Sequence, residues 1–344
     1  MKKTAVLFCL FPFAFCLGSA TACAQTPQVA TIGSGGGPAL IRFQVAPQKG
    51  KPVTDLGPGD IEIYEDGQKR EVVLFEGGSL HPRTVPTVLS LLIDCGRSDL
   101  ASGKVDAAVF KKGLLDEFPH LSVAVYGFAS GPARLAARTR NEADLTKALS
   151  APLLVHPLST FLMDHVSRVL IDAAAGAGPA IRIVSVFSTG RTDQGASSAT
   201  AEEQRYQRAL SIAQQTGVAV YPVLLIPRLA AQDSTPGAAP LEARSSTRGP
   251  QPMLGADIST DTRLRTVGNF VNLGASTGGK KIEIPAGGNM LPTAVNWLAE
   301  QLRNEYIAGF QPTTGEEKRR HNLEVVMKNK DRAKITGGTL TLVY

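Results

Sequence analysis

The sequence predicts an α/β protein with a doubly wound, mostly parallel sheet and a small flanking β domain formed by both chain ends. Short apolar strands alternate with helix-like stretches between residues 85 and 304, which favours a parallel sheet. Segments with strand-like alternation lie before and after that region. At 344 residues, the chain has room for one large domain and a smaller companion.

Residues 1–24 are typical of a secretory signal peptide. A basic start at Lys2 and Lys3 precedes an apolar run, and Ala22-Cys23-Ala24 matches a cleavage site. We therefore predict export, with the mature protein in the periplasm or secreted. The alternative is a lipoprotein anchored at Cys23, and only this alternative places the protein on a membrane.

Cysteine usage argues against a disulfide-stabilised protein, and the distribution of charge argues against a nucleic-acid-binding protein. Cys9, Cys16 and Cys23 lie in the leader, so the mature chain keeps only Cys95 and forms no internal disulfide. The net charge of +6 is not gathered into a dense basic run with aromatic residues between. We therefore predict no nucleic-acid partner.

The region before the α/β domain has two parts. Residues 25–38 are rich in Gly, Ser and Pro and predict a flexible tether. Residues 39–45, 61–65 and 72–75 then alternate between apolar and polar, which predicts strands of a small β domain.

Residues 85–304 are predicted to form the α/β domain, because strand and helix patterns alternate throughout. One segment, 228–259, breaks the rhythm: it is dense in Pro, Ala, Ser, Gly and Arg and predicts a mobile insertion. The predicted strands are 88–93, 121–128, 134–140, 181–187, 218–226 and 281–284, and the predicted helices are 104–117, 160–175, 201–216, 260–275 and 291–304.

The tail returns to strand patterns at 306–310, 323–327 and 339–343. We expect these strands to complete the sheet begun by residues 39–75. The small β domain would then be discontinuous, made of residues 39–80 together with 305–344, with the α/β domain inserted into it.

The most informative stretch is the apolar strand from Val88 to Ile93, which ends in Asp94 and a turn carrying Ser98. Ligands of open α/β sheets bind at the carboxyl ends of the strands. Carboxylate and hydroxyl oxygens at that place suit a hard cation.

Three segments together resemble the von Willebrand factor type A family, and more narrowly the secreted bacterial proteins called VWFA-related. They are residues 60–67 (DIEIYEDG), 91–94 (LLID) and 306–312 (YIAGFQP). The resemblance spans nearly all of the mature chain. It implies a doubly wound α/β domain with a metal-ion-dependent adhesion site at the carboxyl edge of the sheet. It also implies binding of a protein or matrix ligand rather than catalysis.

The family's adhesion site uses Asp-x-Ser-x-Ser, a threonine and a second aspartate. By the resemblance, Asp94, Ser98 and Thr160 keep their places and would be the metal ligands. Two of the five ligands are lost, because Gly96 replaces a serine and Thr189 replaces the second aspartate. Arg97 stands where the family usually has a small residue. The predicted partner-binding residues of this degenerate site are Asp94, Gly96, Arg97, Ser98, Thr160 and Thr189.

Charge decides what this site is expected to do. Losing a carboxylate removes formal charge from a partly buried cation, and the Arg97 guanidinium can neutralise Asp94 without a metal. We therefore predict partner binding without an obligatory metal or other cofactor. The alternatives are a Mg²⁺-dependent site completed by water, a purely structural Asp94 that caps a loop or pairs with Arg97, and binding carried by the insertion 228–259.

An enzyme is not expected, although two residues offer a hydrolase alternative. Residues 274–278 match G-x-S-x-G around Ser276, but a nucleophile elbow follows a strand and begins a helix, whereas this match follows a predicted helix. Cys95 is the other candidate nucleophile. The histidines lack metal-ligand spacing and suggest neither zinc nor a partner for Cys95: they are His81, His120, His156, His165 and His321.

Overall fold

The computed structural model describes residues 31–32, 38–47, 53–78, 80–94, 107–128, 132–150, 161–175, 180–190, 198–226, 260–285, 290–312, 320–336 and 340–343. The predicted signal peptide 1–24 and the predicted insertion 228–259 lie outside these residues. No helix within the described ranges is both long and apolar enough to cross a bilayer.

A six-stranded sheet forms the centre of the α/β region, in the order β11-β10-β9-β6-β7-β8. Neighbouring strands are parallel, except that β8 pairs antiparallel with β7 at one edge. All eight residues of β6 and of β9 are buried, which explains why apolar residues dominate both strands. The strands are β6 (Thr87–Asp94), β7 (Leu121–Phe128), β8 (Pro132–Thr139), β9 (Ile181–Ser188), β10 (Ala219–Ile226) and β11 (Ile282–Pro285).

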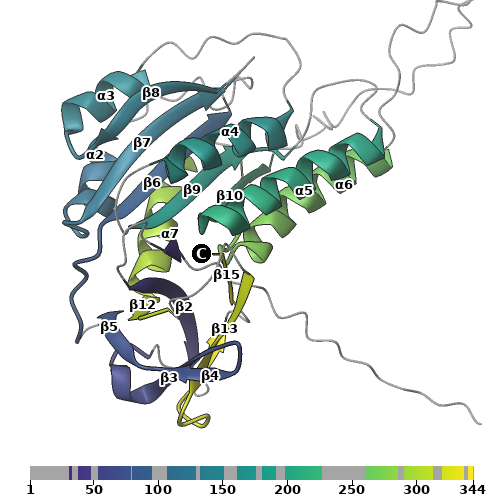
Figure 1. Ribbon diagram of the computed structural model, residues 1–344. Helices are drawn as coiled ribbons and strands as arrows, with labels where there is room; N and C mark the ends of the chain where they lie inside the picture. The colour runs from purple at the N-terminus through teal and green to yellow at the C-terminus, as the bar shows by residue number, and fades with distance from the viewer. Residues whose placement is uncertain are drawn as a thin grey trace, which may run out of the picture.

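Helices cover both faces of this sheet, so the predicted doubly wound, mostly parallel fold is confirmed (Figure 1). One face packs on α2 (Ala107–Phe110), α3 (Glu142–Ser150) and α7 (Met290–Arg303), with a π-helical turn at Lys111–Leu115. The other face packs on α4 (Leu162–Ala174), α5 (Ala199–Thr216) and α6 (Thr260–Ser276).

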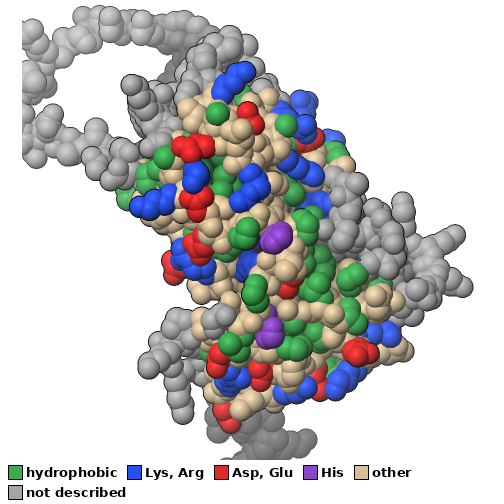
Figure 2. Space-filling view, turned by 90° about the vertical axis from the view of Figure 1, so that its left-hand side faces the viewer, with side chains coloured by type: hydrophobic (Ala, Val, Ile, Leu, Met, Phe, Trp, Pro, Cys, Tyr) green, Lys and Arg blue, Asp and Glu red, His purple; other side chains and the backbone are tan. Residues whose placement is uncertain are grey.

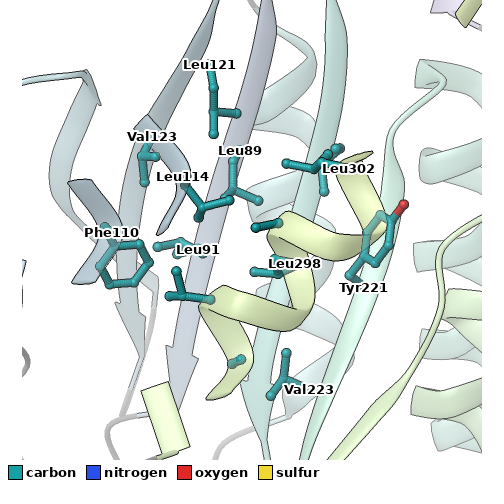
Figure 3. Close-up of a cluster of buried hydrophobic side chains, with 14 of the residues drawn as sticks. Leu89, Leu91, Phe110, Leu114, Leu121, Val123, Tyr221, Val223, Leu298 and Leu302 are labelled. Atoms are coloured by element: carbon teal, nitrogen blue, oxygen red, sulfur yellow. The ribbon is translucent and has the colours of Figure 1, made fainter. Parts of the chain in front are cut away.

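Alternation along each strand divides the core into two apolar layers. Leu89 and Leu91 of β6 point to the α7 side, whereas Leu92 belongs to the layer under α4. Figure 3 shows the first layer, in which Leu298 of α7 and Phe110 of α2 lie over the sheet.

Strands from both chain ends pair in two further sheets. β2 (Ala39–Pro47) pairs antiparallel with β12 (Glu305–Phe310), and β3 (Ile61–Glu65) pairs antiparallel with β13 (Arg320–Met327). The first sheet also contains β1 (Thr31–Ile32), β5 (Val72–Gly77) and β14 (Ala333–Thr336), and the second contains β4 (Gln68–Arg70) and β15 (Leu340–Val343). We call them the terminal sheets.

The tail strands pair with the N-terminal strands, as the sequence predicts, but they form two sheets, so the prediction of a single sheet is wrong. Three elements of the structure were not predicted, namely α3, β4 and β14. The helix expected over 104–117 is described only as the short α2 followed by the π-helical turn. Within the predicted tether, Thr31–Ile32 form β1 and pair with β2. The domain boundaries at residues 80, 85, 304 and 305 stay a prediction.

A buried polar cluster joins the terminal sheets to the central sheet. Arg42 of β2 lies 3.5 Å from Glu305 of β12 and donates a 3.4 Å hydrogen bond to the Tyr221 hydroxyl of β10. That hydroxyl in turn donates to Glu305. We call these three residues the junction. In Figure 3 the Tyr221 hydroxyl points away from the labelled aliphatic side chains.

Candidate functional site

Two strand ends meet at the carboxyl edge of the central sheet. β6 and β9 are parallel neighbours, and their register pairs Ile93 with Phe187. The next residue of each strand, Asp94 and Ser188, therefore lies at the same level. Both side chains are buried, Asp94 with 5% of its surface exposed and Ser188 with none.

Asp94 and Ser188 are joined by a hydrogen bond between strands. The Ser188 hydroxyl donates to Asp94 Oδ2 at 2.9 Å. The same hydroxyl oxygen accepts a hydrogen bond from the Gly190 amide at 3.1 Å. A carboxylate taken out of water needs such donors, because an uncompensated buried charge is costly. The pair therefore holds Asp94 in a fixed position at the strand end.

The turn after β9 depends on glycine. Gly190 has a φ of 69°, in the left-handed region that L side chains rarely adopt. A β-carbon there would also lie 3.2 Å from side-chain atoms of both Leu224 and Phe270. Glycine therefore lets the chain turn sharply enough for its amide to reach Ser188.

Thr189 lies between Ser188 and Gly190, and its hydroxyl has a different environment from that of Ser188. Its Oγ1 is buried, with no hydrogen-bond partner within the described part of the chain. Burying a hydroxyl without a partner costs free energy, so such an atom in a native fold calls for an explanation. Thr189 directly follows Ser188 in the chain, at the edge where ligands of α/β sheets bind.

The structure describes two of the six predicted partner-binding residues, Asp94 and Thr189. Gly96, Arg97, Ser98 and Thr160 lie outside the described residues. The residue that contacts Asp94 from β9 is Ser188, which is not among the predicted site residues. A signal was present, because Ser188 is the polar residue that ends an apolar strand adjacent to β6.

The oxygen donors described at this edge do not by themselves make a magnesium site. Mg²⁺ prefers an octahedron of oxygens and is usually held by one or two carboxylates. The described donors are one carboxylate, Asp94, and the hydroxyls of Ser188 and Thr189. Nowhere in the described ranges do three His, Cys, Asp or Glu side chains come together as metal ligands.

The segment that matches G-x-S-x-G has the structure expected for a helix end. α6 ends at Ser276, and the Thr277 hydroxyl donates to the Leu273 carbonyl at 2.8 Å. Gly278 follows with a φ of 77°, and the next strand is β11. Ser276 therefore follows a helix and precedes a strand, the reverse of a nucleophile elbow. Cys95 lies outside the described residues.

Comparisons with known proteins give similarity only among solved structures. No family model matches the chain, and no curated protein matches it by sequence. Among solved structures, the conserved hypothetical protein BatB from Bacteroides thetaiotaomicron is 16% identical, with a TM-score of 0.40, over 63% of this chain and 98% of that one.

Two pilus proteins also show similarity. The vWF domain of the type V pili tip protein Mfa5 from Porphyromonas gingivalis is 12% identical, with a TM-score of 0.41, over 64% of this chain and 95% of that one. The pilus adhesin SpaC from Lactobacillus rhamnosus GG is 9% identical, with a TM-score of 0.41, over 91% of this chain and 54% of that one. At these values we base no functional inference on the likeness.

Proposed function

We propose that the protein is an exported, von Willebrand factor A-like interaction module that binds a protein or matrix ligand at the carboxyl end of its central sheet. The observation that carries the proposal is the buried Asp94, held by Ser188 at the end of β6. The unpartnered hydroxyl of Thr189, the residue after Ser188, supports the same place. The signal-like residues 1–24 support export.

The proposed docking surface consists of Asp94 and Thr189 together with four residues assigned by the family resemblance. Those four are Gly96, Arg97, Ser98 and Thr160. Asp94 would anchor the surface, and the hydroxyls around it would supply hydrogen bonds to the partner. Such polar groups fix the orientation of a ligand more than they raise its affinity.

In this proposal the site works without an obligatory metal. The second carboxylate of the family pattern is replaced by Thr189, so the charge available to a cation is reduced. The Asp94 Oδ2 atom already accepts a hydrogen bond from Ser188. Both features favour direct contact between the partner and the protein over contact through Mg²⁺.

Calorimetry with Mg²⁺ and Mn²⁺ on the mature chain tests the metal. We expect no saturable binding in the micromolar range, because the described donors include one carboxylate only. Micromolar affinity that disappears in Asp94→Ala would contradict the metal-free site and would establish the Mg²⁺-dependent alternative.

Capture of proteins from an envelope extract of the source organism tests the surface. We expect Asp94→Asn to reduce capture of the wild-type partner by about tenfold or more, equivalent to about 1.4 kcal/mol, and EDTA to leave it unchanged. The matched control is Asp116→Asn, an exposed aspartate that pairs with Lys111. Equal capture by Asp94→Asn and the wild type, with unfolding curves intact, would refute the proposed surface.

A further inference from the structure

The amino end of the central sheet carries a cavity of about 710 Å³. It lies where β6 and β7 begin, at Thr87 and Leu121, and is bordered by the end of α7 and by residues 81–85 of the connection from β5 to β6. Figure 2 shows this side of the molecule, where histidine and hydrophobic side chains lie near one another. Binding sites for small molecules have volumes of roughly 300–1,000 Å³.

This cavity is separate from the proposed docking surface. Thr87 and Asp94 are the two ends of β6, and seven residue steps of about 3.3 Å place them roughly 23 Å apart. The cavity lies between the α/β region and the β5 side of the terminal sheets, and Gly78 and His81 line it from that side.

The walls of the cavity are largely apolar. Pro82 and Val85 line one side, Phe118 and Pro119 come from the loop before β7, and Leu302 comes from the last turn of α7. An apolar ligand body that replaces water on such walls gains roughly 25 cal/mol for each Å² of surface that it buries.

Arg83 is the lining residue that indicates the ligand's charge. Its Nη2 atom donates to the Leu302 carbonyl and, at 2.6 Å, to the Glu305 carbonyl. Its guanidinium lies 5.8 Å from the centre of the Phe118 ring. These contacts hold Arg83 in place, yet none of them is with a carboxylate.

Arg83 differs in this respect from the other arginine of the cavity. Arg303 forms a salt bridge with Glu117, and both line the cavity. Arg83 forms no salt bridge with any described Asp or Glu. Its two hydrogen bonds through Nη2 use two of the five N–H groups of the guanidinium. The Nε and Nη1 atoms donate no hydrogen bond to a described residue. Burial lowers the pKa of Arg83, and the nearby charges of Glu305 and Glu76 oppose this only in part, so an anionic ligand would offset the remaining desolvation.

Two imidazoles add further hydrogen-bonding groups. His81 and His120 line the cavity, and neither ring hydrogen-bonds to a described residue. The His81 ring is held edge-on by Phe75, with ring centres 5.3 Å apart. A polar group of the ligand can therefore meet Arg83 and an imidazole while its apolar part contacts Phe118.

We propose that this cavity binds a small organic acid with an aromatic or branched apolar body, whose carboxylate pairs with Arg83. A carboxylate matches the planar fork of a guanidinium and can accept two parallel hydrogen bonds from it. This site is additional to the interaction surface at Asp94 and does not depend on it.

The test compares two probes of the same shape, 2-naphthoate and the uncharged 2-naphthalenemethanol, by calorimetry on the mature chain. We expect naphthoate to bind at least about tenfold more tightly than the alcohol, because charged hydrogen bonds are roughly twice as strong as neutral ones. Arg83→Gln should remove this preference. The matched control Arg134→Gln, at an arginine that pairs with Asp172 on the surface, should keep it.

A second variant covers the chance that Arg83→Gln impairs folding, since Arg83 holds the end of α7. His120 is exposed and lines the cavity, so His120→Glu should leave the fold intact and weaken naphthoate binding by repulsion while sparing the alcohol. The proposal is overturned if neither probe binds, if both bind equally, or if the folded variants keep the wild-type preference. Asp94→Asn should change neither affinity, so failure here and failure at the docking surface are distinguishable.

Discussion

The layer under α7 and the junction are both buried, but the layer consists of apolar side chains and the junction of charged and polar ones. The layer contains aliphatic and aromatic side chains such as Leu91 and Phe110, which are fully buried. The junction places Arg42 and Glu305 in an equally buried position, with side chains 7% and 2% exposed. Apolar side chains gain from leaving water whatever their neighbours are, whereas buried charges need particular partners.

The pKa directions at the junction show how those partners act. Burial alone would lower the pKa of Arg42, but Glu305 and Tyr221 oppose it and the net pKa is raised. Burial raises the pKa of the Tyr221 hydroxyl, although Arg42 opposes this, and Glu305 raises it further. Tyr221 therefore stays protonated and donates to Glu305, while Arg42 stays charged.

The largest effect is expected from breaking the junction on one side. Glu305→Leu leaves Arg42 buried without its carboxylate, and we expect a loss of about 3 to 5 kcal/mol in the free energy of unfolding. Arg42→Met with Glu305→Leu removes both charges and should restore much of that loss. Urea unfolding of the single and double variants checks this. A double variant as unstable as the sum of the singles would show that the charges do not act as a pair.

Truncating a side chain in the apolar layer should reduce the free energy of unfolding by somewhat less. No second substitution of a charged partner can restore this loss, because the layer contains no charge pair. Leu114 is fully buried beside α7, and we expect Leu114→Ala to lower the free energy of unfolding by about 2 to 5 kcal/mol. Val73→Ala is the control, since Val73 is 48% exposed and should change stability by less than about 0.5 kcal/mol. Equal losses at both positions would contradict the burial of this layer.

The smallest effect concerns pH and the layer under α4. His165 is buried, and burial lowers its pKa, with Arg168 adding to the effect and Asp164 opposing it. An unfolded histidine titrates near a pKa of about 6.5, so lowering the pH below that value protonates the unfolded chain first and destabilises the fold.

We therefore expect wild-type stability to decrease between pH 7.5 and pH 5, and the decrease to be smaller in His165→Gln. Urea unfolding at both pH values measures it. Val73→Ala, at an exposed position without a titratable group, serves as the control and should keep the wild-type slope. An unchanged slope in His165→Gln would exclude His165 as the source.

Local patterns predicted the central sheet well and the smaller elements poorly. β6, β9 and β10 are predominantly apolar along their length, as expected of strands buried on both faces. α3 was missed because its apolar residues are few, although Asn141 carried a capping signal: its side chain accepts from the Ala143 amide at 2.8 Å. β14 was missed because a four-residue strand has too short a pattern.

At the candidate site, the sequence pointed to Asp94 but not to its partner. The Asp94–Ser188 hydrogen bond follows from the parallel register of β6 and β9, which joins residues 94 positions apart. The register between β6 and β9 cannot be recognised from the spacing of residues along the chain. The family pattern drew attention to Thr189, the next residue, whose role as a partner contact stays a prediction.

The sequence by itself determined where most strands and helices of the α/β region lie, because an element buried on one or both faces needs an apolar pattern that can be recognised along the chain. It also determined that Asp94 ends a buried strand. Only the tertiary structure decided which charges would be paired and which cavity would form. Arg42 and Glu305 meet through β2 and β12, whereas Arg83 reaches a cavity lined by the starts of β6 and β7 and the end of α7 and forms no salt bridge with a described carboxylate. Electrostatic partners depend on distances in space of a few ångströms, which the order of residues along the chain does not specify.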